Sequence, residues 1–334
     1  MKKSLLVTFI ALCTSAFAAP PTYKVIDKIK IGGPASWDYV FVDSANHRLY
    51  VSHATQTEVI DTNTDKLVGT IPGTNGVHGI AIADDLGRGF TSDGKDNDVT
   101  IFDIKTLAVL GKVKTGTNPD AIIYEPVTHR VLTFNGRSSD STVFDAKTGA
   151  IVAASVAVGG KPEFAQVDGK GNVYFNNEDK GEVGVIDAKT ATLIRHYSIA
   201  PCDGPSGLAI DPKEMHLFSV CGKKVMAISD GTKLIGTADI GLGVDGVAFD
   251  DGYAFSANGR DGTITMVAET SPGKFAAVAT IPTTQGARTI GADQKAHKLY
   301  LPAAQYGPPG ESKDGKAARP QALPDSFMIV VVGR

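Results

Sequence analysis

Short apolar runs alternate with turn residues along almost the whole chain, and the pattern repeats at a regular interval. Each repeat begins with a polar residue and a first apolar run, followed by a second run, a third run that ends in Asp, and a fourth. The runs alternate apolar and polar side chains, as in Val99–Phe102 and Glu182–Ile186, which indicates β-strands rather than helices. The opening polar residues lie 39 to 43 residues apart, at Asp38, His78, Asp120, Glu163, Ser206, Asp245 and Arg288. The sequence therefore predicts seven similar units of four strands.

A period near 42 residues with four strands in each unit is typical of a β-propeller blade. A single blade cannot cover both of its faces, whereas blades packed face to face around an axis can. We therefore expect an all-β, seven-bladed propeller over residues 19–334. The last unit ends after its third strand, Phe327–Val332, and a spare strand, Tyr23–Ile31, precedes the first unit. We expect Tyr23–Ile31 to complete the seventh blade and close the ring.

The seventh unit contains an insertion, residues 307–325, which is rich in Pro, Gly, Lys and Ala. In a propeller, the loops before the first strands and between the second and third strands share one face, here called the top face. The insertion replaces a short loop on that face. Its composition favours mobility, so the insertion either covers the channel as a lid or is a disordered loop.

Residues 1–18 have the features of a cleaved export signal. Lys2 and Lys3 precede an apolar run, Leu5–Cys13, and an A-x-A cleavage site follows at Ala16–Ala18. The apolar run is too short for a membrane span, and no later stretch approaches that length. We therefore expect a periplasmic or secreted monomer.

Cysteine use is consistent with export. Two of the three cysteines, Cys202 and Cys221, remain after cleavage, and both are expected on the top face of one blade. A disulfide between them suits an oxidising compartment, and two buried free thiols are the alternative.

Several strands resemble the repeats of a known family. Third strands such as Glu58–Thr62 and second strands such as Val173–Asn177 look like YVTN-type propeller repeats, and the chain is similar to the YncE-like branch over essentially residues 19–334. The resemblance implies a seven-bladed propeller in the cell envelope. It implies no single activity, because relatives include binding proteins, surface-layer proteins, domains beside redox enzymes and a binder of single-stranded DNA. This chain departs from the pattern at His53 and Cys221, where the repeat usually has Asn.

Nucleic-acid binding is not expected despite that resemblance. The formal net charge is −3, and no strand face combines basic and aromatic residues. The motifs of nucleotide-binding loops, serine hydrolases, zinc proteases and covalent haem attachment are also absent from the sequence.

The opening polar residues of the seven units should meet at the upper end of the central channel. Four are carboxylates, and two carboxylates about 6 Å apart at an effective dielectric constant of about 20 repel by roughly 3 kcal/mol. Such a ring must hold a cation, pair with Arg288 and His78, or raise the pKa of a carboxyl group. As a metal site it would use five side chains and suit Ca²⁺, Mg²⁺, Mn²⁺ or Zn²⁺: Asp38, His78, Asp120, Glu163 and Asp245. The alternatives are a solvated rim without a dedicated metal and an organic ligand held by the ring.

A second ring of polar residues is expected in the loops after the second strands. Four basic residues occupy matching places in these loops: Lys95, Arg137, Lys223 and Arg260. This collar would steer a small anionic ligand inward, or it only provides charge for solubility. In the same loops, four further side chains are candidates to contact a ligand: His53, Asn135, Asn176 and Asn258. The asparagines have a structural alternative, because Asn also satisfies left-handed turns.

Two more residues near the channel have a structural and a functional interpretation. Trp37, the single tryptophan, adjoins Asp38. Its ring either stacks against a ligand or packs between two blades, and the same two interpretations apply to Tyr39. His78 is the better of the two top-face histidines for proton transfer.

Three functions remain open from the sequence. The first is an exported scaffold that binds a small ligand or a partner at the top of the channel. The second is a metal-assisted, lactonase-like hydrolase, in which the acidic residues hold the ion, His78 moves a proton and Arg288 stabilises an oxyanion. The third is a structural envelope protein.

Overall fold

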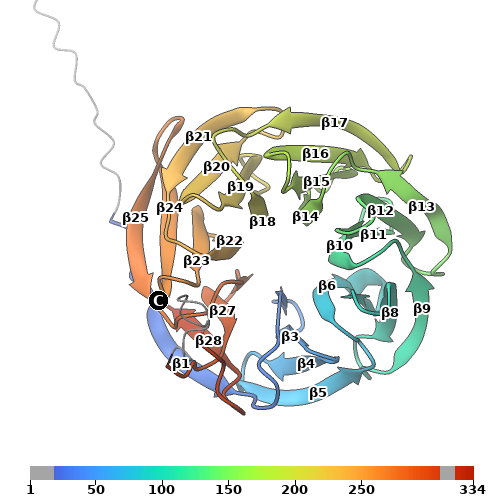
Figure 1. The fold of residues 1–334 in the computed structure, drawn as a ribbon, viewed down its shortest axis with the longest axis horizontal. Helices are drawn as coiled ribbons and strands as arrows, with labels where there is room; N and C mark the ends of the chain where they lie inside the picture. Colours follow the sequence, from blue (N-terminus) through green and yellow to red (C-terminus); the bar gives the residue numbers. More distant parts are fainter. Residues whose placement is uncertain (1–18, 309–319) are drawn as a thin grey trace, which may run out of the picture.

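The computed structural model describes residues 19–308 and 320–334, and they form seven four-stranded antiparallel sheets arranged in a ring (Figure 1). The prediction of a seven-bladed, all-β propeller is therefore confirmed. The expected export signal lies outside the described residues, as does the middle of the expected insertion, residues 309–319. In the described part of the chain no helix is long and apolar enough to cross a membrane.

Six blades take their four strands consecutively from the chain, each from the channel outward. The first three of these blades comprise β2 (Val40–Asp43), β3 (Arg48–His53), β4 (Gln56–Asp61), β5 (Lys66–Pro72), β6 (Val77–Ala83), β7 (Arg88–Asp93), β8 (Asp98–Asp103), β9 (Val109–Lys114), β10 (Pro119–Glu125), β11 (Arg130–Asn135), β12 (Asp140–Asp145) and β13 (Ile151–Ala157). The next three comprise β14 (Pro162–Val167), β15 (Asn172–Asn177), β16 (Glu182–Asp187), β17 (Thr192–Ser198), β18 (Pro205–Asp211), β19 (His216–Cys221), β20 (Val225–Ser229), β21 (Leu234–Asp239), β22 (Val244–Asp250), β23 (Tyr253–Asn258), β24 (Thr263–Ser271) and β25 (Lys274–Pro282). A short 3₁₀ turn, η1 (Asp84–Leu86), links β6 and β7.

The seventh blade joins the two ends of the chain. It contains β26 (Gly291–Asp293), β27 (Lys298–Ala303), β28 (Met328–Gly333) and, as its outer strand, β1 (Lys24–Lys30). β1 pairs antiparallel with β28, from Lys24 opposite Gly333 to Lys30 opposite Met328. The expected closure by the N-terminal strand is thus confirmed, with β1 one residue shorter at each end than Tyr23–Ile31.

Apolar side chains from facing sheets fill the space between blades. Aromatic pairs with ring centroids 5.1 to 5.8 Å apart join consecutive blades: Tyr50–Phe102, Phe90–Phe144 and Phe134–Phe175. All six rings are fully buried. Because each blade is covered on both faces by its neighbours, the inner ends of the first strands keep fixed positions around the axis.

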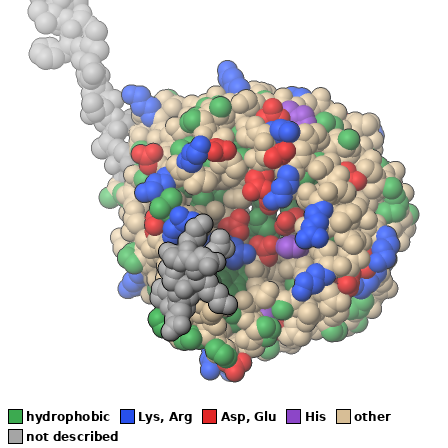
Figure 2. All heavy atoms as spheres, viewed as in Figure 1, with side chains coloured by type: hydrophobic (Ala, Val, Ile, Leu, Met, Phe, Trp, Pro, Cys, Tyr) green, Lys and Arg blue, Asp and Glu red, His purple; other side chains and the backbone are tan. Residues whose placement is uncertain are grey.

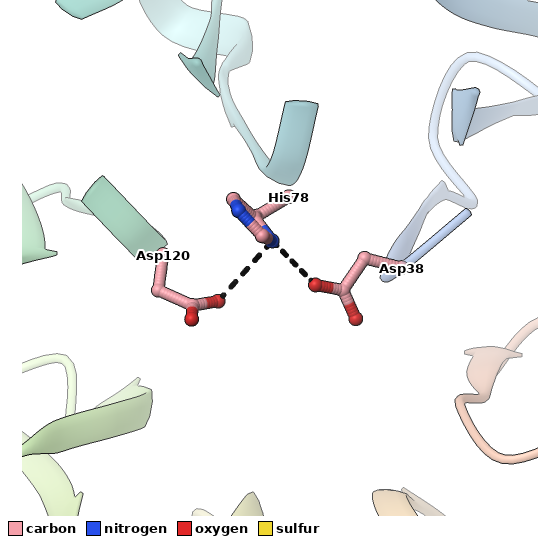
Figure 3. A group of neighbouring side chains, drawn as sticks. All are labelled: Asp38, His78 and Asp120. Carbon is pink, nitrogen blue, oxygen red and sulfur yellow. Dashed lines mark hydrogen bonds and ion pairs between the residues drawn. The ribbon is translucent and has the colours of Figure 1, made fainter. Parts of the chain in front are cut away.

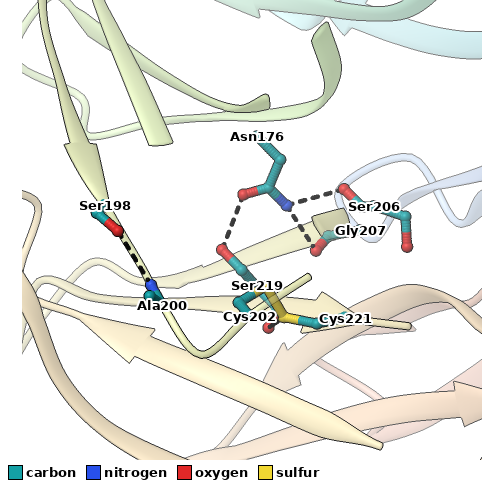
Figure 4. Close-up of a disulfide and its surroundings, with 8 residues drawn as sticks. All are labelled: Asn176, Ser198, Ala200, Cys202, Ser206, Gly207, Ser219 and Cys221. Atoms are coloured by element: carbon teal, nitrogen blue, oxygen red, sulfur yellow. Dashed lines mark hydrogen bonds between the residues drawn. A yellow bond between two sulfur atoms is a disulfide. The ribbon is translucent and has the colours of Figure 1, made fainter. Parts of the chain in front are cut away.

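A disulfide joins Cys202, in the loop before β18, to Cys221, at the end of β19 (Figure 4). The two Cα atoms are 5.4 Å apart, and both side chains are buried. The expected bridge is therefore present, and it ties the top-face loop of the fifth blade to the strand beside it.

Replacing both cysteines tests this bridge. The cross-link spans 19 residues, and closing a loop of about this length restricts the unfolded chain by about 3 kcal/mol. We expect the Cys202→Ser/Cys221→Ser variant to lose about 3 kcal/mol of unfolding free energy in urea. The wild-type protein under reducing conditions should lose the same amount. Equal stability of oxidised wild type and double variant would contradict the prediction.

Candidate functional site

Six of the seven opening polar residues carry charged or ionisable side chains, and all sit where a first strand begins at the channel. The second residues of β6, β10, β14 and β22 are His78, Asp120, Glu163 and Asp245, and each of these side chains is only partly buried. Figure 2 shows acidic side chains and a histidine around a central depression in this face. We call six residues the channel cluster: Asp38, His78, Asp120, Glu163, Asp245 and Arg288. The seventh position, Ser206, is the second residue of β18.

The first half of the channel cluster is centred on His78 (Figure 3). Its Nδ1 lies 2.6 Å from an Asp38 carboxylate oxygen and 3.7 Å from one of Asp120. Burial lowers the pKa of His78, but the hydrogen bond to Asp38 and the charges of Asp120 and Asp38 raise it to about 9. The imidazole is therefore a cation at neutral pH, held between two carboxylates from the neighbouring blades.

The second half is centred on Arg288. Its Nε donates to Asp245 at 2.8 Å, and its Nη2 lies 3.6 Å from Asp38 and donates to the Trp37 carbonyl at 3.3 Å. Burial raises the pKa of Asp245, and the nearby charge of Asp38 adds to this effect, while Arg288 opposes it. Asp38 thus lies between the two cations of the channel cluster.

Glu163 forms an ion pair with Lys161, a residue that the sequence analysis did not identify. Lys161 Nζ lies 2.7 Å from Glu163 and also contacts Glu178 on the next loop. Burial and the charge of Asp120 nevertheless raise the pKa of Glu163 to about 8. Burial likewise raises the pKa of Asp120 to about 6, although His78 lowers it. No feature of the repeat marks position 161, because the other units have no lysine there.

Two aromatic rings close the channel beneath these side chains. Tyr39, from the start of the first blade, meets Phe164 of β14 with ring centroids 4.6 Å apart. Tyr39 is 5% exposed, and burial raises the pKa of its hydroxyl well above the usual value, with Asp245 and Asp38 adding to the effect. Below the rings, the channel is lined mainly by apolar side chains such as Val40, Val247 and Ile290. The channel cluster is therefore reached from the top face.

His53 and Trp37, two of the expected ligand contacts, are buried between the first and seventh blades. His53 is 4% exposed, with Nδ1 3.0 Å from Glu58, Nε2 2.8 Å from the Pro34 carbonyl, and its ring stacked on Phe327. Trp37 is 8% exposed and stacks on the same Phe327 ring. This arrangement does not support direct ligand contact by either side chain. Instead, the Trp37 ring and carbonyl hold the guanidinium of Arg288.

The three asparagines proposed as ligand contacts are fully buried. Asn135 donates to Asp140 at 2.8 Å and Asn258 to Thr265 at 2.9 Å, so each bridges to the adjacent strand of its blade. Asn176 donates to the carbonyls of Ser206 and Gly207 in the next blade (Figure 4). With their amides used internally, these residues hold strands and blades together, and their burial gives no support for direct ligand contact.

The collar residues Lys95, Arg137, Lys223 and Arg260 are all exposed on the top face. Lys223 is paired with Asp203 at 2.7 Å. Arg260 differs from the rest because it borders a hollow next to Arg288, together with Tyr306 at the root of the insertion.

A larger hollow, of about 660 Å³, lies away from the channel cluster, between the fifth and sixth blades. Its acidic side chains already have partners in the fold. Asp250 bonds Tyr23 and His297, Asp211 accepts the Lys213 amide, and Asp251 pairs with Arg334. The acidic side chains named here are therefore already engaged by other groups of the fold.

Comparisons with known proteins define the fold and not the family. No protein-family model and no curated protein matches the chain. Among solved structures, the chain is similar to "Structure of U3-55K" (11% identity, 92% of this chain and 98% of that one, TM-score 0.76) and to "Crystal structure of RRP9 WD40 repeats" (11%, 92% and 97%, 0.77). It is also similar to a chain of Kuenenia stuttgartiensis hydrazine synthase (14% identity, 82% and 94%, TM-score 0.69). At these identities the likeness shows the fold alone, a β-propeller, in agreement with the seven blades of the structure.

Proposed function

We propose that this chain is an exported, YncE-like propeller whose channel cluster binds a small molecule carrying a positive charge. The resemblance of its repeats supports the family, and the expected signal at residues 1–18 together with the Cys202–Cys221 disulfide supports export. Expression of the full chain in a bacterium tests export, with a periplasmic product beginning at or close to Ala19 as the expected result.

The charge balance of the channel cluster carries the proposal. Four carboxylates converge, whereas His78 and Arg288 supply two cations, and Lys161 is shared with Glu178 outside the cluster. Burial raises the pKa of Asp120, Glu163 and Asp245. Ionising all of these carboxylates therefore lowers the stability of the folded protein. A bound cation reduces that cost, because it stabilises the ionised carboxylates.

The surroundings of the channel cluster favour a binding site over a passage. Tyr39 and Phe164 meet across the axis below it, and the carboxylates above them remain 12 to 29% exposed. A small molecule can therefore approach from the top face and contact side chains from several blades.

A divalent metal ion is the second candidate ligand, because Asp38, His78 and Asp120 offer ligand atoms within 4.8 Å of one another. With a metal bound, the same site would suit the hydrolase alternative, in which the ion activates water. A metal on His78 must displace the proton that its raised pKa retains, which favours an organic cation at neutral pH.

Ligand binding is tested with amines and metal salts on the purified mature protein. We expect putrescine and butylamine to raise the thermal midpoint, and isothermal titration to give a Kd for each. Asp245→Asn should weaken amine binding about tenfold, the loss of roughly 1.4 kcal/mol expected for one charge-assisted contact.

The matched control for that variant is Asp239→Asn, at an exposed site on the outer strand β21. It makes the same change in net charge and should leave amine binding unchanged. If Ca²⁺, Mg²⁺, Mn²⁺ or Zn²⁺ raises the midpoint, a chelator reverses the effect and amines have none, the metal alternative replaces the proposal. No response to either class would remove both.

The pH dependence of stability tests the charge balance itself. The pKa of Glu163 rises from 4.5 to about 8 on folding, so the folded protein binds a proton that the unfolded chain releases. Stability from this group is full below about pH 4.5 and is lost as the pH rises towards about 8. We expect Glu163→Gln to lose less stability over this range and to exceed the wild type by roughly 1 to 3 kcal/mol at about pH 8.

Glu214→Gln, at an exposed site, is the control and should follow the wild type. The measurement is urea unfolding at a series of pH values. A further fall towards about pH 9 should persist in every variant, because His78 also binds its proton more tightly when folded. If the unfolding free energies of Glu163→Gln and the wild type change with pH in parallel, the pKa of Glu163 is not raised on folding and this prediction is wrong.

A further inference from the structure

A second hollow, of about 530 Å³, opens beside the channel cluster between the sixth and seventh blades. Its polar lining consists of Arg260, Gln285, Arg288 and Tyr306, and no carboxylate is among its lining residues in the described part of the chain. Two guanidinium groups border this hollow and no described carboxylate lines it, so it is more positive than the adjoining, predominantly acidic channel cluster. We call it the arginine hollow.

Arg288 belongs to both sites. Its Nε and Nη2 face the channel cluster through Asp245, Asp38 and the Trp37 carbonyl. Its Nη1 makes no hydrogen bond or ion pair with any described residue, and the side chain is 39% exposed. The guanidinium therefore forms the wall between the two sites.

Arg260 is the second cation, and its guanidinium pairs with no carboxylate in residues 19–308 and 320–334. The neighbouring carboxylate, Asp261, instead accepts the backbone amide of Leu242 at 2.7 Å. Arg260 is thus available to an anion from solvent, and guanidinium groups bind carboxylate and phosphate oxygens through paired hydrogen bonds.

Three glycines allow the side chains of the arginine hollow to rest on the backbone. A Cβ at Gly259 would lie 2.8 Å from Arg288 Cβ, and one at Gly243 would lie 2.6 Å from Arg260 Cβ. At Gly286, where φ is +89°, a Cβ would lie 2.5 Å from the ring of Tyr306. Any larger residue at these positions would displace a lining side chain, so the shape of the hollow depends on these close approaches.

We propose that the arginine hollow binds the anionic end of the same molecule whose cationic end occupies the channel cluster. The ligand is then a small zwitterion with an amine and an oxyanion group, carboxylate or phosphate. This inference rests on the proposed function, because it assigns the ligand class of that site. Gln285 and Tyr306 add neutral hydrogen-bond donors at the edge, where part of the ligand remains in solvent.

Titration calorimetry with matched probes tests the inference. The probes are alkylamines, the ω-amino carboxylates of the same chain lengths, O-phosphoethanolamine, butyrate and inorganic phosphate. We expect the best zwitterion to bind the wild type at least about tenfold more tightly than its matched amine. Comparing the amino carboxylates with O-phosphoethanolamine distinguishes a carboxylate from a phosphate.

The decisive variant is Arg260→Ala, with Arg260→Gln as a milder change if alanine disturbs folding. Either should abolish the advantage of the zwitterion, while the matched amine should bind no more weakly than it does to the wild type, because the variant removes a like charge. Arg137→Ala is the matched control, because Arg137 occupies the equivalent loop position in the third blade and does not line the arginine hollow. It should keep the full advantage.

The outcomes separate the two proposals. If amines bind but zwitterions bind no better, or if Arg260→Ala keeps the advantage, the arginine hollow is not the anion site and the proposed function stands. If neither amines nor zwitterions bind the wild type, both proposals fail. If butyrate or phosphate alone binds as tightly as the zwitterions, the channel cluster contributes nothing and the zwitterion proposal fails.

Discussion

The pairing of β1 with β28 is the constraint on which this molecule depends. It places strands from opposite ends of the propeller in one sheet, so the seventh blade has its fourth strand only when the ring is closed. Blade packing then holds seven first strands around one axis, and residues as distant in sequence as Asp38 and Arg288 come within 3.6 Å of each other. A ring opened at this point would lose the geometry of the channel cluster, because that cluster has no local element of its own.

Closing the ring concentrates like charge. Asp38, Asp120, Glu163 and Asp245 approach one axis from four blades, and burial raises the pKa of three of them. His78 and Arg288 offset part of the repulsion, and both share Asp38 as a partner. Placing these carboxylates together costs free energy, because apolar or hydroxyl residues would fill the same positions at lower cost.

The top face also separates charge of opposite sign over a short distance. The channel cluster is mainly acidic, while the arginine hollow beside it is lined by Arg260 and Arg288 and by no described carboxylate. Arg288 links the two, and Trp37 stabilises it by stacking between the first and seventh blades. Residues buried for packing therefore still influence the site, through the position they impose on one guanidinium group.

The repeat pattern was enough to predict the number of blades, the closing strand and the disulfide, because strand alternation and a regular period are local properties of the chain. It also identified the opening residues as neighbours, since equivalent positions in a closed ring share one radius. The repeat pattern did not predict which way individual side chains point. Asn177 pairs with Pro162 in the same way as Asn135 pairs with Pro119, so Asn177 is the equivalent of Asn135. Asn176 lies one residue earlier in the strand, and its side chain therefore points to the opposite face of the sheet. His53, Trp37 and the asparagines face packed blades, Lys161 reaches Glu163 from outside the repeat pattern, and the arginine hollow forms between two blades. These features depend on which surfaces meet after closure, and only the tertiary structure determines that.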